Sequence, residues 1–167
     1  MKNTLLFMVL AAGLSFLLCA GAAADIIYVN GETGSDDNDG PSPDMAKSTI
    51  QAGIDAALDG ETVFVADGTY MGEGNRDIDF CGKAITVRSE HGAESCIIDC
   101  GGSEEEYHRG FCFHSGEDPK SILDGFTIKN GYYRDGGGIY CDSGSSPIIE
   151  NNIISNNLAS YRGGRIR

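Results

Sequence analysis

The chain has 167 residues, the length of one domain, and its 24 glycines are about twice the usual share. Apolar residues make up 41% and charged residues 22%, which excludes a bundle of membrane helices and a disordered acidic tail. Asp and Glu outnumber Lys and Arg by 25 to 12, and the resulting net charge of −13 repels phosphate backbones. The composition therefore disfavours nucleic acid as a partner, and the glycine content indicates short strands joined by tight turns.

Residues 1–24 have the features of a secretory signal peptide. Lys2 precedes an apolar run over residues 4–18, and small residues follow up to Ala24. A run of about 15 residues is shorter than the ~20 that a helix needs to span a bilayer. We expect cleavage before Asp25, a mature chain without a transmembrane anchor, and a secreted protein located outside the cell, at its surface or in the periplasm.

Five cysteines follow the signal segment, and this odd number leaves at least one thiol without a partner in the same chain. The chain contains no C-x-x-C pair, so a structural zinc site is not predicted. Their disulfide pairing stays open, and the simpler interpretation is that most of them are small apolar core residues. The five are Cys81, Cys96, Cys100, Cys112 and Cys141.

The first predicted elements are a strand at residues 26–29 and a short helix that begins near residue 48. Ser48 and Gln51 have the spacing of a capping box, and Gly60 ends the segment. The helix presents one apolar stripe, made of Ile50, Ile54, Ala57 and Leu58. Such a helix suits a lid over the first turn of a repeating fold, where strand edges would otherwise be unpaired.

Short segments of alternating apolar residues then recur about every 26 residues. Residues 110–116 return as 138–144, and the apolar-apolar-acid pattern of 97–99 returns at 122–124 and 148–150. A single unit of this size cannot bury its own apolar side chains, but coils whose equivalent strands stack in parallel can. Regular hairpins of an antiparallel sandwich would not keep the residue classes in phase.

Stacking at a constant offset predicts two interior columns of side chains. The first contains Val63, Ile85, Phe111 and Ile139, and the second contains Val65, Val87, Phe113 and Cys141.

Several stretches resemble exported right-handed parallel β-helix proteins of the pectate-lyase-like superfamily, and the resemblance covers nearly all of residues 25–167. The stretches that carry it are residues 26–29, 34–40, 49–57, 60–70 and 136–148. The resemblance implies an all-β, right-handed parallel β-helix with a short N-terminal capping helix. Residues 25–60 would form the cap and residues 61–167 the coils, which we expect to be incomplete at the C-terminus because relatives continue for more coils.

The same superfamily contains lyases, hydrolases, epimerases and adhesins, so the resemblance is weak for activity. The catalytic motifs of its lyases and hydrolases are absent from this sequence, and we expect no catalytic residue here. The leading hypothesis is an exported scaffold that recognises a polysaccharide or another cell-surface component. Two alternatives stay open: a fragment of a lyase, hydrolase or epimerase that acts on acidic glycans, and a structural or adhesive module.

Two small groups of residues are candidate sites. Tyr132 and Tyr133 beside Arg134 could stack on a sugar ring, although packing at a corner of the coil is the simpler interpretation. In-register coils would also bring three carboxylates to about 5 Å from one another and favour a bridging Ca²⁺ ion, with a solvated acidic stripe as the alternative. These carboxylates belong to Asp99, Asp124 and Glu150.

The acidic loop at residues 35–40 superficially resembles a calcium loop. Ser35 occupies its first position, and Ala46 stands where an EF-hand needs a bidentate glutamate. We therefore expect a polar turn there.

Overall fold

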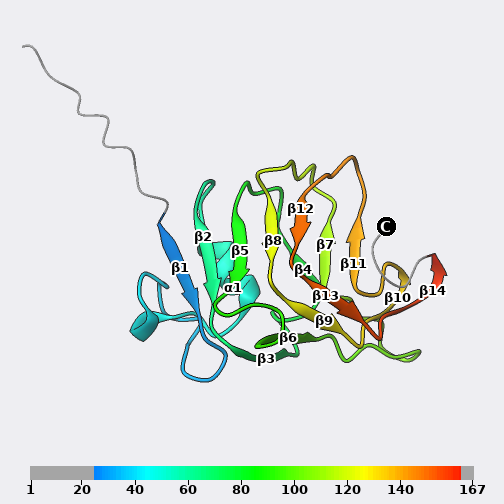
Figure 1. Cartoon of the computed structure of the whole chain (residues 1–167), viewed down its shortest axis with the longest axis horizontal. Coiled ribbons are helices and arrows are strands. Elements are labelled where there is room, and N and C mark those ends of the chain that lie inside the picture. Colours follow the sequence, from blue (N-terminus) through cyan, green and yellow to red (C-terminus); the bar gives the residue numbers. More distant parts are fainter. Residues whose placement is uncertain (1–24, 163–167) are drawn as a thin grey trace, which may run out of the picture.

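The computed structural model describes residues 25–162, in which fourteen strands, one α-helix and one 3₁₀-helix follow one another. The predicted signal segment and residues 163–167 lie outside the described residues. The strands stand side by side along the long axis of the molecule (Figure 1).

The strands form three larger sheets and one pair. The five-stranded sheet has the order β1 (Ile26–Val29), β2 (Thr62–Val65), β5 (Thr86–Ser89), β8 (Ile122–Asp124) and β12 (Ile148–Glu150). The four-stranded sheet contains β3 (Gly68–Met71), β6 (Cys96–Asp99), β9 (Thr127–Lys129) and β13 (Ile153–Ser155). The three-stranded sheet contains β4 (Ile78–Asp79), β7 (Phe111–Phe113) and β11 (Ile139–Cys141), and β10 (Tyr132–Asp135) pairs with β14 (Leu158–Arg162).

All strand pairs in these sheets are parallel, so the fold is a parallel β-solenoid. Each complete coil adds one strand to each of the larger sheets, which is why neighbours in a sheet are far apart in sequence. Ile139 lies directly beside Phe111, and Cys141 lies beside Phe113, as stacked coils require. The predicted parallel β-helix is confirmed, and the antiparallel sandwich is wrong.

The predicted columns are correct only in part, because the coils differ in length. Val63 lies beside Val87 in the five-stranded sheet, whereas Phe111 and Ile139 belong to the three-stranded sheet. Ile85 is buried in the core but precedes strand β5 by one residue, and Val87, not Ile85, is the register partner of Val63. A constant offset therefore joined strands of two different sheets.

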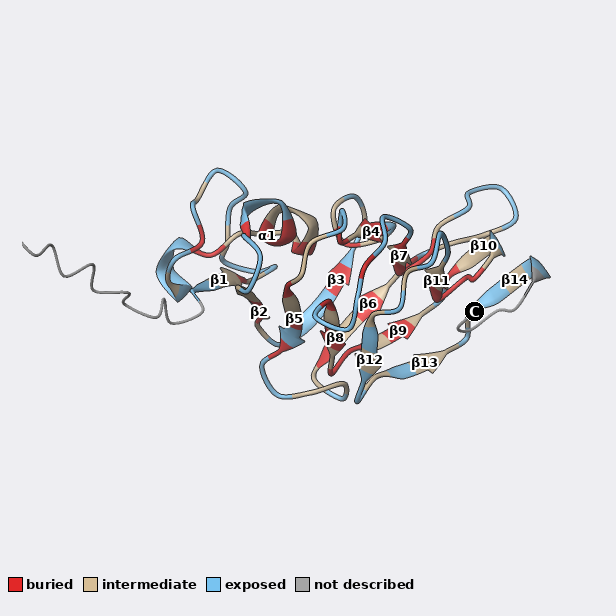
Figure 2. Cartoon of the chain, turned by 90° about the horizontal axis from the view of Figure 1, so that it is seen from above, coloured by how far each residue is buried: buried red, intermediate tan, exposed pale blue. Residues whose placement is uncertain are grey.

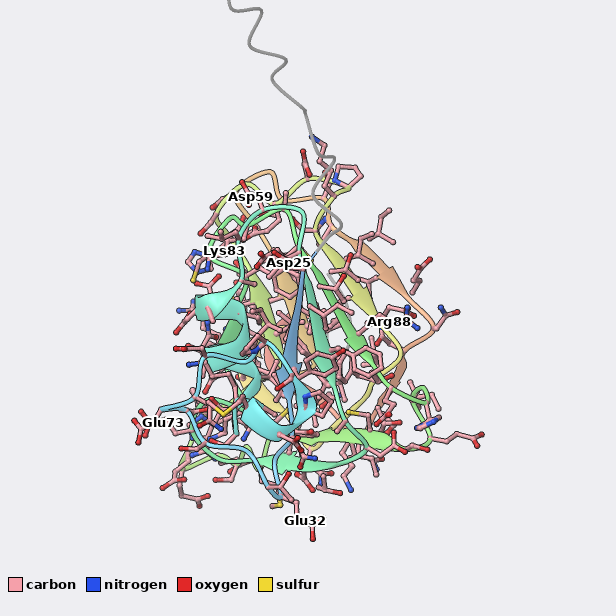
Figure 3. All side chains as sticks on the ribbon, turned by 90° about the vertical axis from the view of Figure 1, so that its left-hand side faces the viewer. Asp25, Glu32, Asp59, Glu73, Lys83 and Arg88 are labelled. Atoms are coloured by element: carbon pink, nitrogen blue, oxygen red, sulfur yellow. The ribbon has the colours of Figure 1, made fainter. Side chains whose placement is uncertain are left out.

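Inward-facing side chains from the three sheets fill the interior, as the end-on view shows (Figure 3). The fully buried members include four phenylalanines, and the ring centroids of Phe80 and Phe113 are 4.7 Å apart. Buried and more exposed residues alternate along most strands, so buried segments follow the inside of the coil (Figure 2). Burial of apolar surface stabilises the stack by about 25 cal/mol for each Å² removed from water.

Helix α1 (Ile50–Ala56) covers the N-terminal end of the stack and packs on β1, β2 and β4. Its N-cap is Thr49, whose hydroxyl accepts a hydrogen bond from the amide of Ala52, so the predicted capping box at Ser48 is wrong by one residue. The helix ends before Ala57, and Leu58 is consequently exposed instead of joining the apolar stripe. The short 3₁₀-helix η1 (Pro43–Met45) precedes α1.

The side chain of Gln51 pairs with the open edge of strand β4. Its amide oxygen accepts from the backbone N–H of Asp79 at 2.9 Å, and its amide nitrogen donates to the carbonyl of the same residue at 3.1 Å. These two bonds replace those of a neighbouring strand. The predicted role of the helix as a lid over the first coil is supported by this contact.

Candidate functional site

A cavity of about 270 Å³ opens on the outer face of the three-stranded sheet. Asp79 of β4 and Cys112 of β7 lie side by side in register and form its floor. The segment before β7 and strand β10 supply its walls. The lining residues are Asp77, Asp79, Tyr107, Arg109, Cys112, His114 and Tyr133.

Arg109 is the central charge of this cavity, although only 7% of it is exposed. Its guanidinium carbon lies 3.5 Å from the ring centroid of Tyr133 and 4.6 Å from that of Tyr140, which are cation–π distances. Its Nη1 atom is buried and has no hydrogen-bond partner among the described residues. A buried donor in this state costs about 1–3 kcal/mol, so a ligand that accepts its hydrogen bond would remove that cost.

Two aspartate–histidine pairs flank the arginine. The Nδ1 atom of His108 lies 2.6 Å from Asp77 Oδ2, and the Nε2 atom of His114 lies 2.8 Å from Asp79 Oδ2. Asp77 also accepts a hydrogen bond of 2.9 Å from the backbone N–H of Arg109. Both aspartates and His114 line the cavity, whereas His108 adjoins it only through its bond to Asp77. An imidazole held by a carboxylate can accept and release protons.

The cavity thiol is not a nucleophile at neutral pH. Burial, together with Asp79 and other carboxylates, raises the pKa of Cys112 despite the opposing charge of Arg109. Burial likewise raises the pKa of Cys96 and of Cys100 to about 12, and both lie in the apolar core as expected. All five cysteines of residues 25–162 are free thiols.

The three residues predicted to bind a sugar lie together on β10, but they face different surroundings. Tyr133 lines the cavity, and its ring centroid is 6.0 Å from that of Tyr107. Tyr132 also stacks on Tyr107, at 5.5 Å. Arg134 is exposed and lies over the ring of Tyr161 at 5.3 Å, away from the residues that line the cavity.

The predicted column of three carboxylates is wrong. Asp124 lies beside Glu150, but its other neighbour in the five-stranded sheet is Arg88. Asp99 belongs to the four-stranded sheet, where its register partner Lys129 approaches its Oδ2 atom to 3.5 Å. The sequence pattern at 97–99 resembles those at 122–124 and 148–150, yet the chain places it one corner later in its coil.

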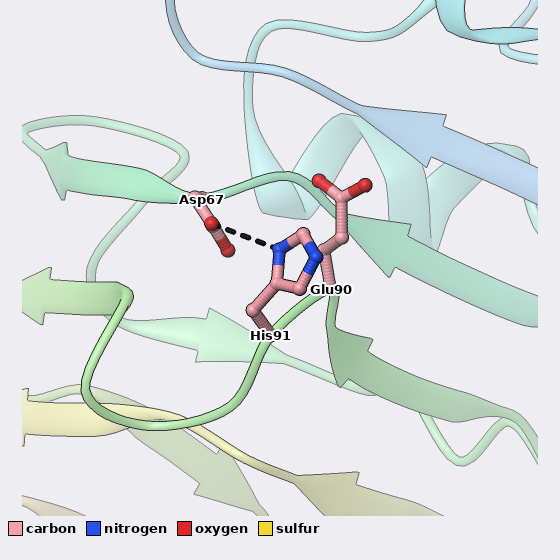
Figure 4. A group of neighbouring side chains, drawn as sticks. All are labelled: Asp67, Glu90 and His91. Carbon is pink, nitrogen blue, oxygen red and sulfur yellow. Dashed lines mark hydrogen bonds and ion pairs between the residues drawn. The ribbon is translucent and has the colours of Figure 1, made fainter.

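A second group of possible metal ligands lies where two neighbouring coils turn (Figure 4). Asp67 follows β2, and Glu90 and His91 follow β5, so parallel pairing of these strands brings the three side chains together. Their donor atoms lie within 4.8 Å of one another, and the Nδ1 atom of His91 is 2.9 Å from Asp67 Oδ2. Imidazole and carboxylate groups are ligands that zinc accepts. All three residues are exposed, however, and two of them, Asp67 and His91, already form an ion pair with each other.

The acidic loop at residues 35–40 is a polar turn anchored to the helix, as expected. Asp36 accepts hydrogen bonds from the backbone N–H groups of Ser48 and Thr49 and from the Thr49 hydroxyl. Burial raises the pKa of Asp36, but these hydrogen bonds outweigh burial and hold it below its ordinary value. The carboxylate therefore serves the start of α1.

Sequence reasoning missed Arg109 and both aspartate–histidine pairs. The partners are 31 and 35 residues apart in the chain and meet only through the stacking of β4 on β7. The available signal was weak: His108 and His114 flank the predicted strand within residues 110–116, but no strand was predicted near Asp77 and Asp79.

Comparisons with known protein families, with curated proteins and with solved structures find no match. Among residues 25–162, no helix is long and apolar enough to cross a membrane. The class of protein is thus defined by the fold itself, a parallel β-solenoid with an aromatic, charge-bearing cavity on one face.

Proposed function

We propose that this protein is an exported β-solenoid scaffold, related to the pectate-lyase-like proteins, that recognises a polysaccharide or another cell-surface component. The single observation that carries the proposal is the cavity in which Tyr107 and Tyr133 stand beside the buried guanidinium of Arg109. Aromatic faces and a few convergent polar groups are typical of ligand sites. Its volume suits one sugar unit of a longer chain that runs along the outer face.

The rigidity of the strands that carry the cavity also supports a role in ligand recognition. The cavity is built on β4 and β7, whose inward residues Ile78, Phe111 and Phe113 are fully buried. Sites placed on such packed strands keep their geometry without a ligand, which lowers the entropy cost of binding. The signal-like segment at residues 1–24 favours export. Outside the cell, polysaccharides are abundant extended ligands.

A glycan array followed by calorimetry tests the proposal. We expect Tyr107→Ala and Tyr133→Ala to weaken binding of the retained glycan roughly tenfold, because an aromatic stacking contact contributes about 0.5–1.5 kcal/mol. Tyr28→Ala is the matched control, since its ring packs on Phe64 on the five-stranded sheet, at 5.9 Å between centroids. Absence of any glycan ligand, or equal losses in all three variants, would contradict recognition at this cavity.

A second candidate function is turnover of an acidic glycan, which the His114–Asp79 pair favours. A carboxylate that orients an imidazole at a cavity is the arrangement of a general base. Incubation with uronate polymers, monitored for new reducing ends and unsaturated products, distinguishes this enzyme from a binding module. A structural or adhesive module predicts neither binding of free glycans nor turnover.

A further inference from the structure

The charges around the cavity indicate that it binds a negatively charged group and that pH controls the strength of this binding. We propose that the Arg109 cavity is an anion site that strengthens in acid and takes a carboxylate or sulfate substituent. As a glycan subsite the proposal rests on the proposed function, although the anion site itself can be tested without a glycan.

The guanidinium carries the first part of the argument. Arg109 is 93% buried, lines the cavity and has its Nη1 atom without a hydrogen-bond partner among the described residues. Its aromatic neighbours Tyr133 and Tyr140 hold the plane of the guanidinium but offer it no acceptor at Nη1. A planar fork of N–H donors matches the oxygens of a carboxylate or sulfate, and such charge-assisted bonds are about twice as strong as neutral ones.

The two aspartate–histidine pairs carry the second part. When both imidazoles are uncharged, the single positive charge of Arg109 faces the negative charges of Asp77 and Asp79. An incoming anion is then repelled by more charge than attracts it. Histidine side chains gain their proton between about pH 8 and pH 5. When His108 and His114 are both protonated, each offsets the charge of the aspartate to which it is bound, so the charge of Arg109 prevails and the site attracts anions.

The other groups near the cavity do not reverse this change. Cys112 stays a neutral thiol at neutral and acid pH, because burial and nearby carboxylates raise its pKa. The remaining charged groups near these elements are carboxylates and cationic side chains, and neither kind ordinarily changes its charge between pH 8 and pH 5. The carboxylates are Asp55, Glu104, Glu105, Glu117, Asp135 and Asp142, and the cationic side chains are Arg76, Lys83 and Arg134.

Binding and protonation must then be coupled in both directions. If protonation of the histidines favours the anion, the bound anion favours their protonation to the same extent. The complex therefore takes up protons from the buffer near neutral pH. Calorimetry in two buffers with different heats of ionisation measures this uptake directly, and a site that merely adds contacts would not produce it.

The experiment uses the mature chain with four probes: inorganic sulfate, a uronic acid trimer, a sulfated neutral trisaccharide and the same trisaccharide without sulfate. We expect the two charged sugars and sulfate to bind roughly tenfold more tightly at pH 5.0 than at pH 7.5, because protonation of the two histidines offsets the aspartates that line the cavity. The uncharged trisaccharide should show no such change. Comparison of the uronate with the sulfated sugar decides between the two anionic groups.

Matched variants distinguish the pH effect at the cavity from the effect of the negative charge that the whole protein loses in acid. The double change His108→Asn and His114→Asn keeps side chains that can hydrogen-bond to Asp77 and Asp79 but cannot titrate, so it should abolish both the pH effect and the proton uptake. His91→Asn is the control, because it removes an aspartate–histidine pair at a different corner. Arg109→Lys should lose most sulfate affinity at pH 5.0, and circular dichroism shows whether this variant is folded.

The possible failures are distinguishable. Sulfate affinity that does not change between pH 7.5 and pH 5.0, or a pH effect that survives the double variant, would overturn the acid-strengthened anion site. Binding of sulfate with the expected pH effect but of no sugar would leave the anion site standing and refute the proposed glycan function. Equal binding of charged and uncharged sugars at both pH values would refute the anion site and leave the proposed glycan function standing.

Discussion

Single side chains hold neighbouring coils together by bonding to backbone groups that the sheets leave unpaired. Glu117 is 1% exposed, and its carboxylate accepts hydrogen bonds from the backbone N–H groups of Gly82 and Ser115 and from the hydroxyl of Ser145. These three partners lie at equivalent corners after β4, β7 and β11. One carboxylate thus connects three successive coils.

We expect Glu117→Gln to destabilise the protein by about 1–3 kcal/mol at pH 7, because an amide cannot accept all three bonds and one charge-assisted set is lost. Burial raises the pKa of Glu117, but the bonds from Ser145, Ser115 and Gly82 outweigh burial and lower it from its ordinary 4.5. The stabilisation is therefore fully present above pH 4.5 and is lost as the pH falls through the lower folded-state value. Urea unfolding of wild type and Glu117→Gln at pH 7 and pH 3 measures the destabilisation and its loss in acid.

Glu73→Gln serves as the control, because it removes the same charge from an exposed side chain. A difference in unfolding free energy between wild type and Glu117→Gln that is the same at pH 7 and pH 3 would show that the charge of Glu117 contributes nothing.

Helix α1 lies in close contact with the first two strands at Gly53. A Cβ atom built on Gly53 would lie 2.6 Å from Val29 Cγ2 and 2.9 Å from Val63 Cγ1. β-branched side chains have few alternative rotamers, so these methyl groups cannot easily move away. The absence of a side chain at Gly53 therefore allows the short distance between helix and sheet. The helix is also held at its C-terminal end, where Lys83 Nζ donates hydrogen bonds to three backbone carbonyls.

Gly53→Ala is expected to destabilise the protein by about 1–2 kcal/mol, although alanine favours a helix by nearly 1 kcal/mol over glycine. Thermal unfolding of this variant should therefore occur several degrees below wild type. Ala56→Gly is the comparison, since Ala56 is exposed in the same helix and its change reports propensity alone. A stabilised Gly53→Ala variant would mean that the helix shifts on the sheet at no cost.

Across the whole molecule, packing is uneven along the axis of the coil. At the capped end, α1 covers β2 and β4, and inward residues such as Val63 are fully buried. At the other end of the described residues, β12 and β13 are the last strands of their sheets. Ile148 and Ile153 are 38% and 45% exposed there.

Amide hydrogen exchange should follow this gradient. We expect amides of β12 and β13 to exchange at least tenfold faster than those of β8 and β9, because strands with one neighbour open more easily than strands with two. Mass spectrometry of peptides across residues 122–129 and 148–155 measures the difference. Equal protection in the two peptides would contradict it and would indicate that another segment or molecule covers β12 and β13 in solution.

The fold could be predicted from the residues of single segments. Alternation at Thr62–Val65 and Phe111–Phe113 marks strands with one buried face, and the return of residues 110–116 at 138–144 marks stacked coils. Both signals are local or nearly so, since side-chain direction along a strand has a period of two. Tyr133, which lines the cavity, was selected for a different reason, as an aromatic residue beside Arg134 at an expected corner, and the structure places it on strand β10.

The site depended on the tertiary structure, because strand register decides which coils meet. Val87 lies beside Val63 and Leu123, yet these steps span 24 and 36 residues, since the corners between strands differ in length. A constant period therefore grouped Asp99 wrongly with Asp124 and gave no indication that His114 meets Asp79. Corner length is set by long-range pairing and packing, so the sequence alone determined a stack of parallel coils, and only the folded chain decided which charges gather around Arg109.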